Sequence, residues 1–455
     1  MNNSRNINRA PEEYGNFASR IWQNEVDKNF LDINDNFNFT AFLCKNITLQ
    51  VTEDCNLACS YCYQHNKTHN SMDFATAKQI IDTVLNDDDI LNKKAIILEF
   101  IGGEPLLKID LISQITDYYF KEMSQKDVKL AARTKISLCS NGVLYFNEKV
   151  QEYLRKYKNF ISFTVSIDGN KELHDSCRVF KNGDPTYDIA VKAALHYMHT
   201  YNNHIPTKMT FAKENINYIY DGITNLYNLG YKVINCNCAY EPNWTVDDAK
   251  IIYSEFKKVA DYIIDQDKET EIFNSYFSEH IGIPNTLDST TWNSNWCGGN
   301  GNMLAADYNG IWYPCLRYMP SSIGDKQPII ECGDIKNGID HSVLKEMQKV
   351  TYLSQSTEEC INCPVNSGCG WCTAYNYEVT GDINKRLTNI CWTHKARSLV
   401  NTYFYNKIYK KHGEKTRIPI YLSEEDALQI ISQEEYELLK QLAKSDEIKN
   451  DCVIC

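Results

Sequence analysis

Residues 51–63 read Val-Thr-Glu-Asp-Cys-Asn-Leu-Ala-Cys-Ser-Tyr-Cys-Tyr and place Cys55, Cys59 and Cys62 in a Cys-x3-Cys-x2-Cys triplet. A protein-closed zinc site uses four ligands, and an iron–sulfur cube is closed by four thiolates. Three thiolates on a cube leave one iron open to a further ligand. The triplet therefore predicts a reactive site rather than a purely structural one.

The composition limits the class of protein. The chain has 455 residues, 43% of them apolar, which is enough to bury a sizeable core and to form more than one domain. Its 18 cysteines cluster at metal-ligand spacings, and no signal-peptide segment opens the chain, so we expect a cytoplasmic, metal-binding protein. No apolar stretch approaches the roughly 20 residues of a membrane helix. A net charge of −12 disfavours nucleic acid as a partner, because neutralising phosphates needs a basic face.

From about residue 46, short β-rich runs alternate with amphipathic helical stretches, which indicates parallel strands joined by crossover helices. Six such units predict an α/β fold with a partial (β/α)6 barrel, whose functional loops lie at the carboxyl ends of the strands. The triplet follows the first strand directly, so it lies at that edge. The expected strands are 47–52, 96–101, 135–139, 162–167, 207–212 and 232–236, and the expected helices are 73–85, 109–122, 148–158, 187–200, 216–229 and 246–267.

The alternation fails beyond about residue 270, where Gly, Asn, Trp and Cys become dense. This composition predicts a loop-rich, cysteine-dense domain held together by metal rather than by a large core. Two helical runs follow, at 394–412 and 424–443. The expected division is an N-terminal extension over 1–45, the partial barrel over 46–270, the cysteine-dense domain over 271–411, and a C-terminal helical extension with a tail over 412–455.

With Tyr61 as the aromatic residue, the Cys-x3-Cys-x-aromatic-Cys motif resembles the signature of the radical S-adenosylmethionine (radical SAM) enzymes. The resemblance implies a 4Fe–4S cluster on Cys55, Cys59 and Cys62 and bound S-adenosylmethionine. The reduced cluster splits the sulfonium, and the resulting 5′-deoxyadenosyl radical removes a hydrogen atom from unactivated carbon. The residues that the resemblance implies in cofactor binding are Tyr61, Gly102, Gly103, Glu104, Ser140, Asn141, Ser166, Asp168 and Arg178.

These residues lie in short polar motifs after consecutive expected strands. In the Gly-Gly-Glu-Pro turn at 102–105, glycines let the backbone approach a ligand, and Glu104 carries the charge opposite to the methionine ammonium. Arg178 suits the methionine carboxylate, because its planar fork binds carboxylates bidentately. Taken alone, each motif is ordinary turn chemistry, and only the shared position beside the triplet favours a site. Other cysteines are expected to be small buried side chains, namely Cys44, Cys139, Cys177, Cys236 and Cys238.

A second cysteine set follows as Cys297, Cys315, Cys360-x2-Cys363-x5-Cys369-x2-Cys372 and Cys391. Its order resembles the SPASM extension of peptide-modifying radical SAM enzymes, with the last gap of the middle run one residue short. The resemblance implies two auxiliary 4Fe–4S clusters, which makes three clusters in all. Either Cys332 completes the inner one, or an iron there is open to substrate. By themselves the two Cys-x2-Cys pairs suit zinc about as well. The implied ligands are Cys360, Cys363, Cys369 and Cys391 for the outer cluster and Cys297, Cys315 and Cys372 for the inner one.

The substrate is indicated by the surroundings of this set. Leu316 and Arg317 follow Cys315 where sulfatase-maturing relatives have an aspartate, which disfavours a sulfatase substrate. The run Cys-Gly-Trp-Cys-Thr-Ala-Tyr-Asn-Tyr at 369–377 resembles maturases of sactipeptides and ranthipeptides. That resemblance implies thioether cross-linking of a cysteine-containing precursor peptide, with a low-potential electron donor such as ferredoxin or flavodoxin. The alternatives are another SPASM enzyme, such as a sulfatase maturase or a carbon–carbon cyclase, and a non-enzymatic zinc or electron-transfer protein.

The two ends of the chain add weaker expectations. Only 45 residues precede the first barrel strand, so leader recognition is expected to use a short element, the C-terminal extension or a partner protein. The aromatic stretch 37–43 could pair an extended leader at a sheet edge, or it could be a buried first strand. The terminal Cys452-x2-Cys455 pair is expected to be part of a frayed tail.

Overall fold

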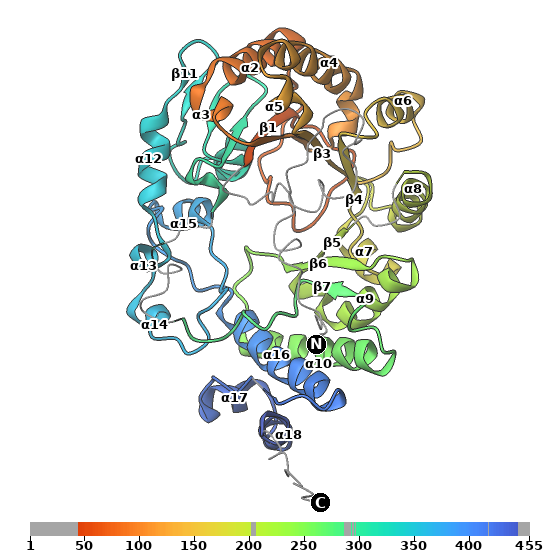
Figure 1. Ribbon diagram of the computed structural model, residues 1–455, viewed down its shortest axis with the longest axis vertical. Coiled ribbons are helices and arrows are strands. Elements are labelled where there is room, and N and C mark those ends of the chain that lie inside the picture. The colour runs from red at the N-terminus through yellow and green to blue at the C-terminus, as the bar shows by residue number, and fades with distance from the viewer. Residues whose placement is uncertain are drawn as a thin grey trace, which may run out of the picture.

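The computed structural model describes residues 44–201, 206–285, 293, 295, 297–416 and 418–444. The aromatic stretch 37–43 and the Cys452 and Cys455 pair lie outside the described residues. Figure 1 shows two sheets, one above the other, with helices on the outside and the C-terminal helices at the lower end. No helix within the described ranges is both long enough and apolar enough to cross a membrane.

The larger sheet has the strand order β4-β3-β2-β1-β8-β9. Strands β1 to β4 are parallel to their neighbours, and β8 adds to the free edge of β1, also in parallel. A strand that follows Cys297 therefore belongs to the same sheet as the first barrel strand. The bounds are β1 (Cys44–Thr52), β2 (Ala95–Gly102), β3 (Thr134–Ser140), β4 (Ile161–Val165), β8 (Met303–Ala306) and β9 (Trp312–Tyr313).

The smaller sheet holds the remaining barrel strands, β5 (Thr207–Phe211) and β6 (Val233–Cys238), with the short β7 (Phe273–Asn274). The predicted α/β partial barrel is confirmed, but the backbone hydrogen bonding between neighbouring strands is interrupted between β4 and β5. At this point the Thr210 N–H donates to Asp168 Oδ1 over 3.0 Å. A side chain therefore links the two sheets where backbone pairing stops.

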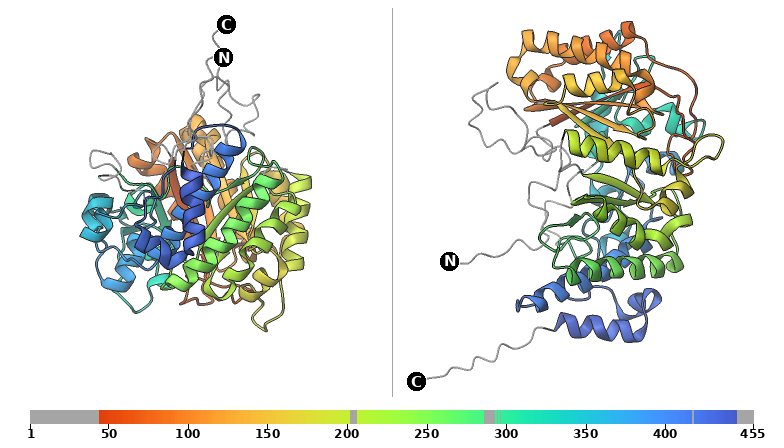
Figure 2. Two further views of the ribbon diagram at one scale, coloured as in Figure 1. Left: turned by 90° about the horizontal axis from the view of Figure 1, so that it is seen from below. Right: turned by 90° about the vertical axis from the view of Figure 1, so that its right-hand side faces the viewer.

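Helices cover the outer side of both sheets (Figures 1 and 2). Their starts follow local capping: Asp73 accepts the Thr76 N–H, and Thr245 forms a capping box with Asp248. The long helices are α2 (Phe74–Asn86), α4 (Ile109–Lys126), α6 (Glu148–Lys156), α8 (Tyr187–Thr200), α9 (Ile219–Asn228) and α10 (Val246–Asp265). Short turns between them are α3 (Asp88–Leu91), η2 (Pro105–Lys108), α5 (Val128–Ala132), α7 (Lys171–Cys177) and η3 (Lys213–Tyr218).

The inner face of the larger sheet is polar. The register aligns Thr48 with Glu99 and Glu99 with Ser137, and Thr48 Oγ1 donates to Glu99 Oε2 over 2.7 Å. Cys139 is exposed although its strand β3 is flanked on both sides, which means that this inner face is open to solvent there. The expectation of a buried Cys139 is therefore wrong. Burial is confirmed for Cys44, Cys177 and Cys236, whereas Cys238 is partly exposed.

The C-terminal segment combines short turns with one long helix. Helix α16 (Cys391–Lys411) lies beside α10 (Figures 1 and 2). The ring of Phe404 in α16 stacks on the ring of Phe277, which follows β7, with centroids 4.2 Å apart. The single helix expected over 424–443 is instead two, α17 (Glu424–Ile430) and α18 (Gln433–Ala443), because Ser432 caps the second. The other elements are η4 (Gly298–Asn300), η5 (Leu316–Tyr318), α11 (Pro320–Ile323), β10 (Gly333–Asp334), β11 (Gly338–Ile339), α12 (His341–Lys349), α13 (Tyr352–Gln355), α14 (Glu358–Ile361) and α15 (Thr373–Thr380).

Candidate active site

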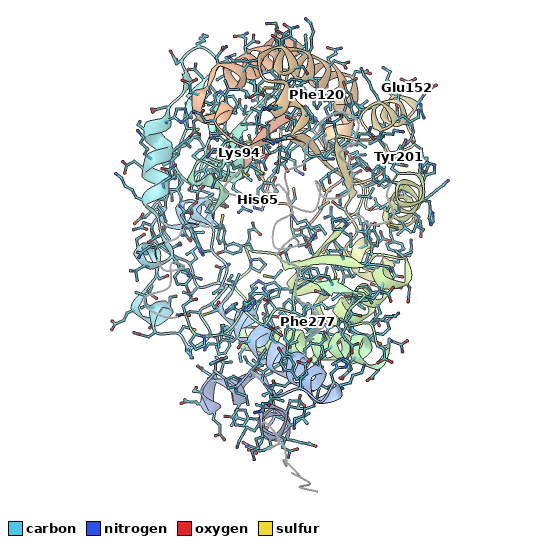
Figure 3. All side chains as sticks on the ribbon, in the orientation of Figure 1. His65, Lys94, Phe120, Glu152, Tyr201 and Phe277 are labelled. Atoms are coloured by element: carbon cyan, nitrogen blue, oxygen red, sulfur yellow. The ribbon has the colours of Figure 1, made fainter. Side chains whose placement is uncertain are left out.

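The loop that follows β1 brings the three triplet thiols together. Burial raises the pKa of Cys55 to about 11, and the neighbouring Cys59 thiol acts in the same direction. Burial also raises the pKa of Cys59, with Cys62 adding to the effect. Cys55 and Cys62 therefore each lie near enough to Cys59 for the charges of the thiols to interact. Figure 3 shows His65, three residues after Cys62, near the middle of the molecule in this view.

A cation that sequence reasoning missed lies beside these thiols. Lys67 Nζ donates to Cys62 Sγ over 3.2 Å. Burial opposes the charge of this lysine, but the Cys62, Cys55 and Cys59 thiols outweigh it, so that the pKa of Lys67 is raised. A lysine five residues after a cysteine carries no recognisable sequence signal, because many exposed loops contain one.

The glycine turn after β2 packs directly on the triplet loop. A Cβ at Gly102 would lie 2.7 Å from the Thr52 carbonyl oxygen, and a Cβ at Gly103 only 2.3 Å from that of Asp54. The Glu104 N–H donates to the same Asp54 oxygen over 2.9 Å. Only glycine allows this approach of two backbones, so these residues position the cysteine loop.

Glu104 connects the turn to the end of β3. Its buried carboxylate accepts hydrogen bonds from Ser140 Oγ over 2.8 Å and from the Asn141 N–H over 2.9 Å. Burial raises the pKa of Glu104, while these hydrogen bonds and the Arg178 charge counteract the rise. The structure therefore brings five residues of the predicted cofactor site together beside the triplet loop, namely Gly102, Gly103, Glu104, Ser140 and Asn141.

Asp168 is the centre of a second group at the end of β4. Arg178 Nε donates to Asp168 Oδ2 over 2.6 Å, and the Tyr61 hydroxyl donates to the same oxygen. The Arg178 guanidinium lies 5.3 Å from the Tyr61 ring centroid and acts on the Cys59 thiol. Arg178 therefore lies beside the triplet as expected, but an internal carboxylate already occupies its Nε.

Ser166 and His174 support this group. The Ser166 N–H donates to the Ser140 carbonyl over 2.9 Å, which continues the alignment of β3 and β4 beyond the last paired residues. His174 Nδ1 accepts the Asp168 N–H over 3.3 Å. Burial lowers the pKa of His174 to about 4, so the ring is neutral and its Nδ1 is available as an acceptor.

The inner cysteine set comes from three separate segments. Cys297 precedes η4, Cys315 precedes η5, and Cys372 precedes α15. Burial raises the pKa of Cys315, and the thiols of Cys297 and Cys372 act in the same direction. A Cβ at Gly299 would lie 3.6 Å from Cys297 Sγ and 3.8 Å from Cys315 Sγ. Gly299 therefore lies against both the Cys297 and the Cys315 thiol.

Cys332 follows β9 and lies in a buried environment of its own. Its N–H donates to the Trp312 carbonyl over 2.7 Å, and its side chain is fully buried. Burial raises the pKa of Cys332 to about 12, and the charged groups that modify it are Lys45 and Asp340 rather than a cysteine. No cysteine is among the groups that modify the pKa of Cys332, and its place in the inner cluster stays a prediction.

The outer set is more compact. Cys360 lies in α14, Cys363 and Cys369 in the following loop, and Cys391 opens α16. Burial raises the pKa of Cys369 to about 12, with Cys391, Cys363 and Cys360 acting in the same direction and Arg386 opposing it. The Arg386 guanidinium also donates to the Cys369 carbonyl over 2.9 Å.

Arg317 lies between the triplet segment and the inner set. Its guanidinium is 5.1 Å from the ring centroid of Tyr63, the residue after Cys62, and 5.9 Å from that of Tyr375. It forms an ion pair with Glu241, and burial opposes its charge while Cys372 favours it, so that the pKa of Arg317 is raised. Arg317 therefore contacts one residue next to the triplet, Tyr63, and one near the inner set, Tyr375.

The donor sets fit iron–sulfur clusters. Thiolates are the metal-binding form of cysteine, and these thiols are mostly half-buried. Burial raises the pKa of Cys55, Cys59, Cys315 and Cys369, whereas nearby cations favour the negative charge. Three such cations are Lys67 at the triplet, Arg317 at the inner set and Arg386 at the outer set. Two sets of three cysteines each suit a cube with one open iron better than a closed zinc site.

Comparisons with known proteins agree with this arrangement. Residues 49–252 match the family model of the Radical SAM superfamily. An uncharacterised protein of Methanocaldococcus jannaschii is 35% identical over 191 residues, which are 42% of this chain and 61% of that protein. The radical SAM cyclopropyl synthase TigE of Paramaledivibacter caminithermalis is 23% identical over 77% of this chain and 71% of its own. A solved structure, native anSMEcpe with bound AdoMet and the Cp18Cys peptide, shares the fold with a TM-score of 0.60 at 16% identity, over 81% of this chain and 98% of that one.

Proposed function

Since this chain is an enzyme with a radical SAM domain, we propose that it matures a ribosomally made precursor peptide by joining a cysteine sulfur to a carbon of another residue. In this proposal, Cys55, Cys59 and Cys62 hold the cluster that binds S-adenosylmethionine. When bound, the two groups supply a 5′-deoxyadenosyl radical. Glu104, together with the end of β3, orients the cofactor, and the chain excludes water from the reacting carbon.

The inner cysteine set is the observation that carries the thioether proposal. In this proposal Cys297, Cys315 and Cys372 hold the inner cluster without Cys332, which leaves one coordination position without a protein thiolate. A peptide thiol that occupies this position would lose its proton, since metals lower the pKa of a bound thiol. Arg317 would hold the neighbouring negative charge, as it already lies between Tyr63 and Tyr375.

Atoms and electrons balance in this reaction. A thiol and a C–H bond become one C–S bond, and two hydrogens are lost. One would transfer as a hydrogen atom to the 5′-deoxyadenosyl radical, which becomes 5′-deoxyadenosine, and the other would leave as the thiol proton. Cys360, Cys363, Cys369 and Cys391 would hold the outer cluster, which would supply an acceptor for the remaining electron. A low-potential protein such as ferredoxin or flavodoxin would supply the electron that starts each turnover.

The relatives support a peptide substrate without fixing the bond that is formed. TigE is by name a cyclopropyl synthase, and anSMEcpe was solved with a peptide bound. The second candidate is therefore another SPASM-type reaction, oxidation of a sulfatase or carbon–carbon cyclisation. Leu316, directly after Cys315, argues against the sulfatase reaction, because it supplies no carboxylate to act as the base, and neither does Arg317 after it.

Anaerobic reconstitution tests the cofactor part of the proposal. If three clusters form, the protein should contain about 12 iron and 12 sulfide per chain, and it should cleave S-adenosylmethionine. Tightly bound zinc, together with no cleavage of S-adenosylmethionine, would instead favour the non-enzymatic zinc-binding protein. Mass spectrometry of the peptide encoded beside the gene tests the bond. Loss of two hydrogens per link with cysteines protected from alkylation supports thioethers, whereas the same loss with every thiol still alkylatable rules them out.

A further inference from the structure

Lys67 is held beside the triplet by its two neighbours in the chain. The Asn66 N–H donates to the Ser321 carbonyl over 3.0 Å, which ties the loop to α11. The Thr68 hydroxyl donates to the Glu53 carboxylate, which ties it to the end of β1. The backbone on both sides of Lys67 is therefore anchored, and its ammonium reaches Cys62 Sγ from a fixed position.

The other cations near the triplet are paired with carboxylates. Arg178 donates to Asp168, and Lys181 forms an ion pair with Asp54 at 3.3 Å. Within the described part of the chain, no ion pair between Lys67 and a carboxylate is formed. A carboxylate paired with Lys67 would cancel most of its positive charge at the neighbouring groups. Without such a pair, the charge of Lys67 acts on the Cys62 thiol, to which it donates.

Charge and hydrogen bonds at the ligand sulfurs set the reduction potential of an iron–sulfur cluster. A positive charge beside the ligands stabilises the reduced, more negative state. We propose that Lys67 raises the reduction potential of the triplet cluster by donating an N–H···S hydrogen bond to Cys62 and by holding its positive charge beside that ligand. The inference rests on the proposed cluster at the triplet and adds a residue that lets a milder electron donor reduce it.

Three variants and one control test this role in the reconstituted full-length enzyme. Lys67→Met removes charge and donor, Lys67→Gln keeps a donor, and Lys67→Arg keeps both. Lys181→Met is the matched control, because it removes the same charge from an exposed lysine that pairs with Asp54, the residue before Cys55. The measurement is a redox titration followed by electron paramagnetic resonance of the signal that changes when S-adenosylmethionine is added.

We expect Lys67→Met to be about tenfold harder to reduce at a given potential, a shift of roughly 59 mV for one electron. Lys67→Gln should shift in the same direction by less, and Lys67→Arg and Lys181→Met should titrate like the wild type. If Lys67→Met does not retain the cluster, the Lys67→Gln titration decides. Wild-type potentials in both neutral variants would overturn the inference. Absence of a cofactor-sensitive signal in the wild type would instead overturn the proposed function.

Discussion

The triplet and the inner cysteine set both offer three thiols, but they are built in different ways. The triplet cysteines lie within eight residues on one loop after β1. The inner cysteines come from three segments between Cys297 and Cys372, and they meet only when β8 has joined β1. The first site is thus a property of a local motif, whereas the second is a property of the complete fold.

Their counter-charges differ in the same way. Lys67 has a direct contact with a triplet thiol, and Asn66 and Thr68 fix its position. Arg317 shares its charge with two carboxylates, Glu241 and Glu378, besides Cys372. We infer that the charge at the triplet is available to a cluster, while the charge at the inner set is largely compensated. The following predictions test this contrast.

The largest expected effect separates the two sites by replacing one ligand in each. Cys59→Ser should reduce cleavage of S-adenosylmethionine by more than about 100-fold, since even an outer partner of a metal is worth 10–100-fold. Cys372→Ser should keep cofactor cleavage and lose peptide modification. The two products, 5′-deoxyadenosine and modified peptide, are measured in the same assay. Thioether formation by Cys372→Ser would contradict the role given to the inner set.

Two glycine variants compare how tightly each site is packed. Gly103→Ala should destabilise the fold by about 3 kcal/mol and lower cofactor binding, because its Cβ would meet the Asp54 carbonyl at 2.3 Å. The added Cβ in Gly299→Ala would lie at ordinary contact distances. The free energy of unfolding of the metal-free variant should therefore lie within about 0.5 kcal/mol of the wild-type value. The variant should nevertheless retain about four fewer irons per chain, because the added methyl enters the space between two thiols. An unchanged iron content in Gly299→Ala would show that this space holds no cluster.

Replacing Arg317 tests whether the positive charge at the inner set stabilises the fold. Arg317→Met leaves the buried Glu378 with Lys326 as its remaining cation, and we expect a loss of about 2 kcal/mol in the free energy of unfolding. Arg317→Lys should recover part of this loss, because it keeps the charge but not the fork that reaches two carboxylates. Chemical denaturation of both variants provides the values. Equal stability of Arg317→Met and the wild type would remove Arg317 from the packing between the two sites.

The smallest expected effect concerns pH and compares His174, near the triplet, with His394, near the outer set. Burial lowers the pKa of each imidazole to about 4 from its usual 6.5. The unfolded chain therefore binds a proton in the interval from pH 6.5 to 4 that the folded chain does not, and stability falls as pH is lowered through it. Between pH 7 and 5.5 each histidine should contribute about 1 kcal/mol of this loss. The pH dependence of thermal unfolding should become flatter in His174→Gln and in His394→Gln, and an unchanged slope in either would mean that its ring is already charged when folded.

The local part of this molecule could be predicted from its sequence. The strands at 44–52 and 95–102 were expected within a few residues, because both are short β-rich runs and the triplet marks the end of the first. The glycine turn and Glu104 were expected beside the triplet, and they lie there. Local periodicity and a short motif are sufficient for these features.

Features that depend on distant partners could not be predicted. The pairing of β8 with β1 joins residues more than 250 positions apart, and no local pattern indicates it. The exposure of Cys139 follows from the open inner face of the sheet. Lys67 was missed for the same reason, since its contact with Cys62 depends on how the loop is anchored to Ser321.

The central claim is that the triplet holds a cluster with one open iron that binds S-adenosylmethionine. Electron paramagnetic resonance of the reduced, oxygen-free enzyme with and without this cofactor tests the claim most directly. We predict a cluster signal whose shape changes on addition of the cofactor and which is absent from Cys59→Ser. A reduced enzyme whose signals are all insensitive to the cofactor would contradict the account.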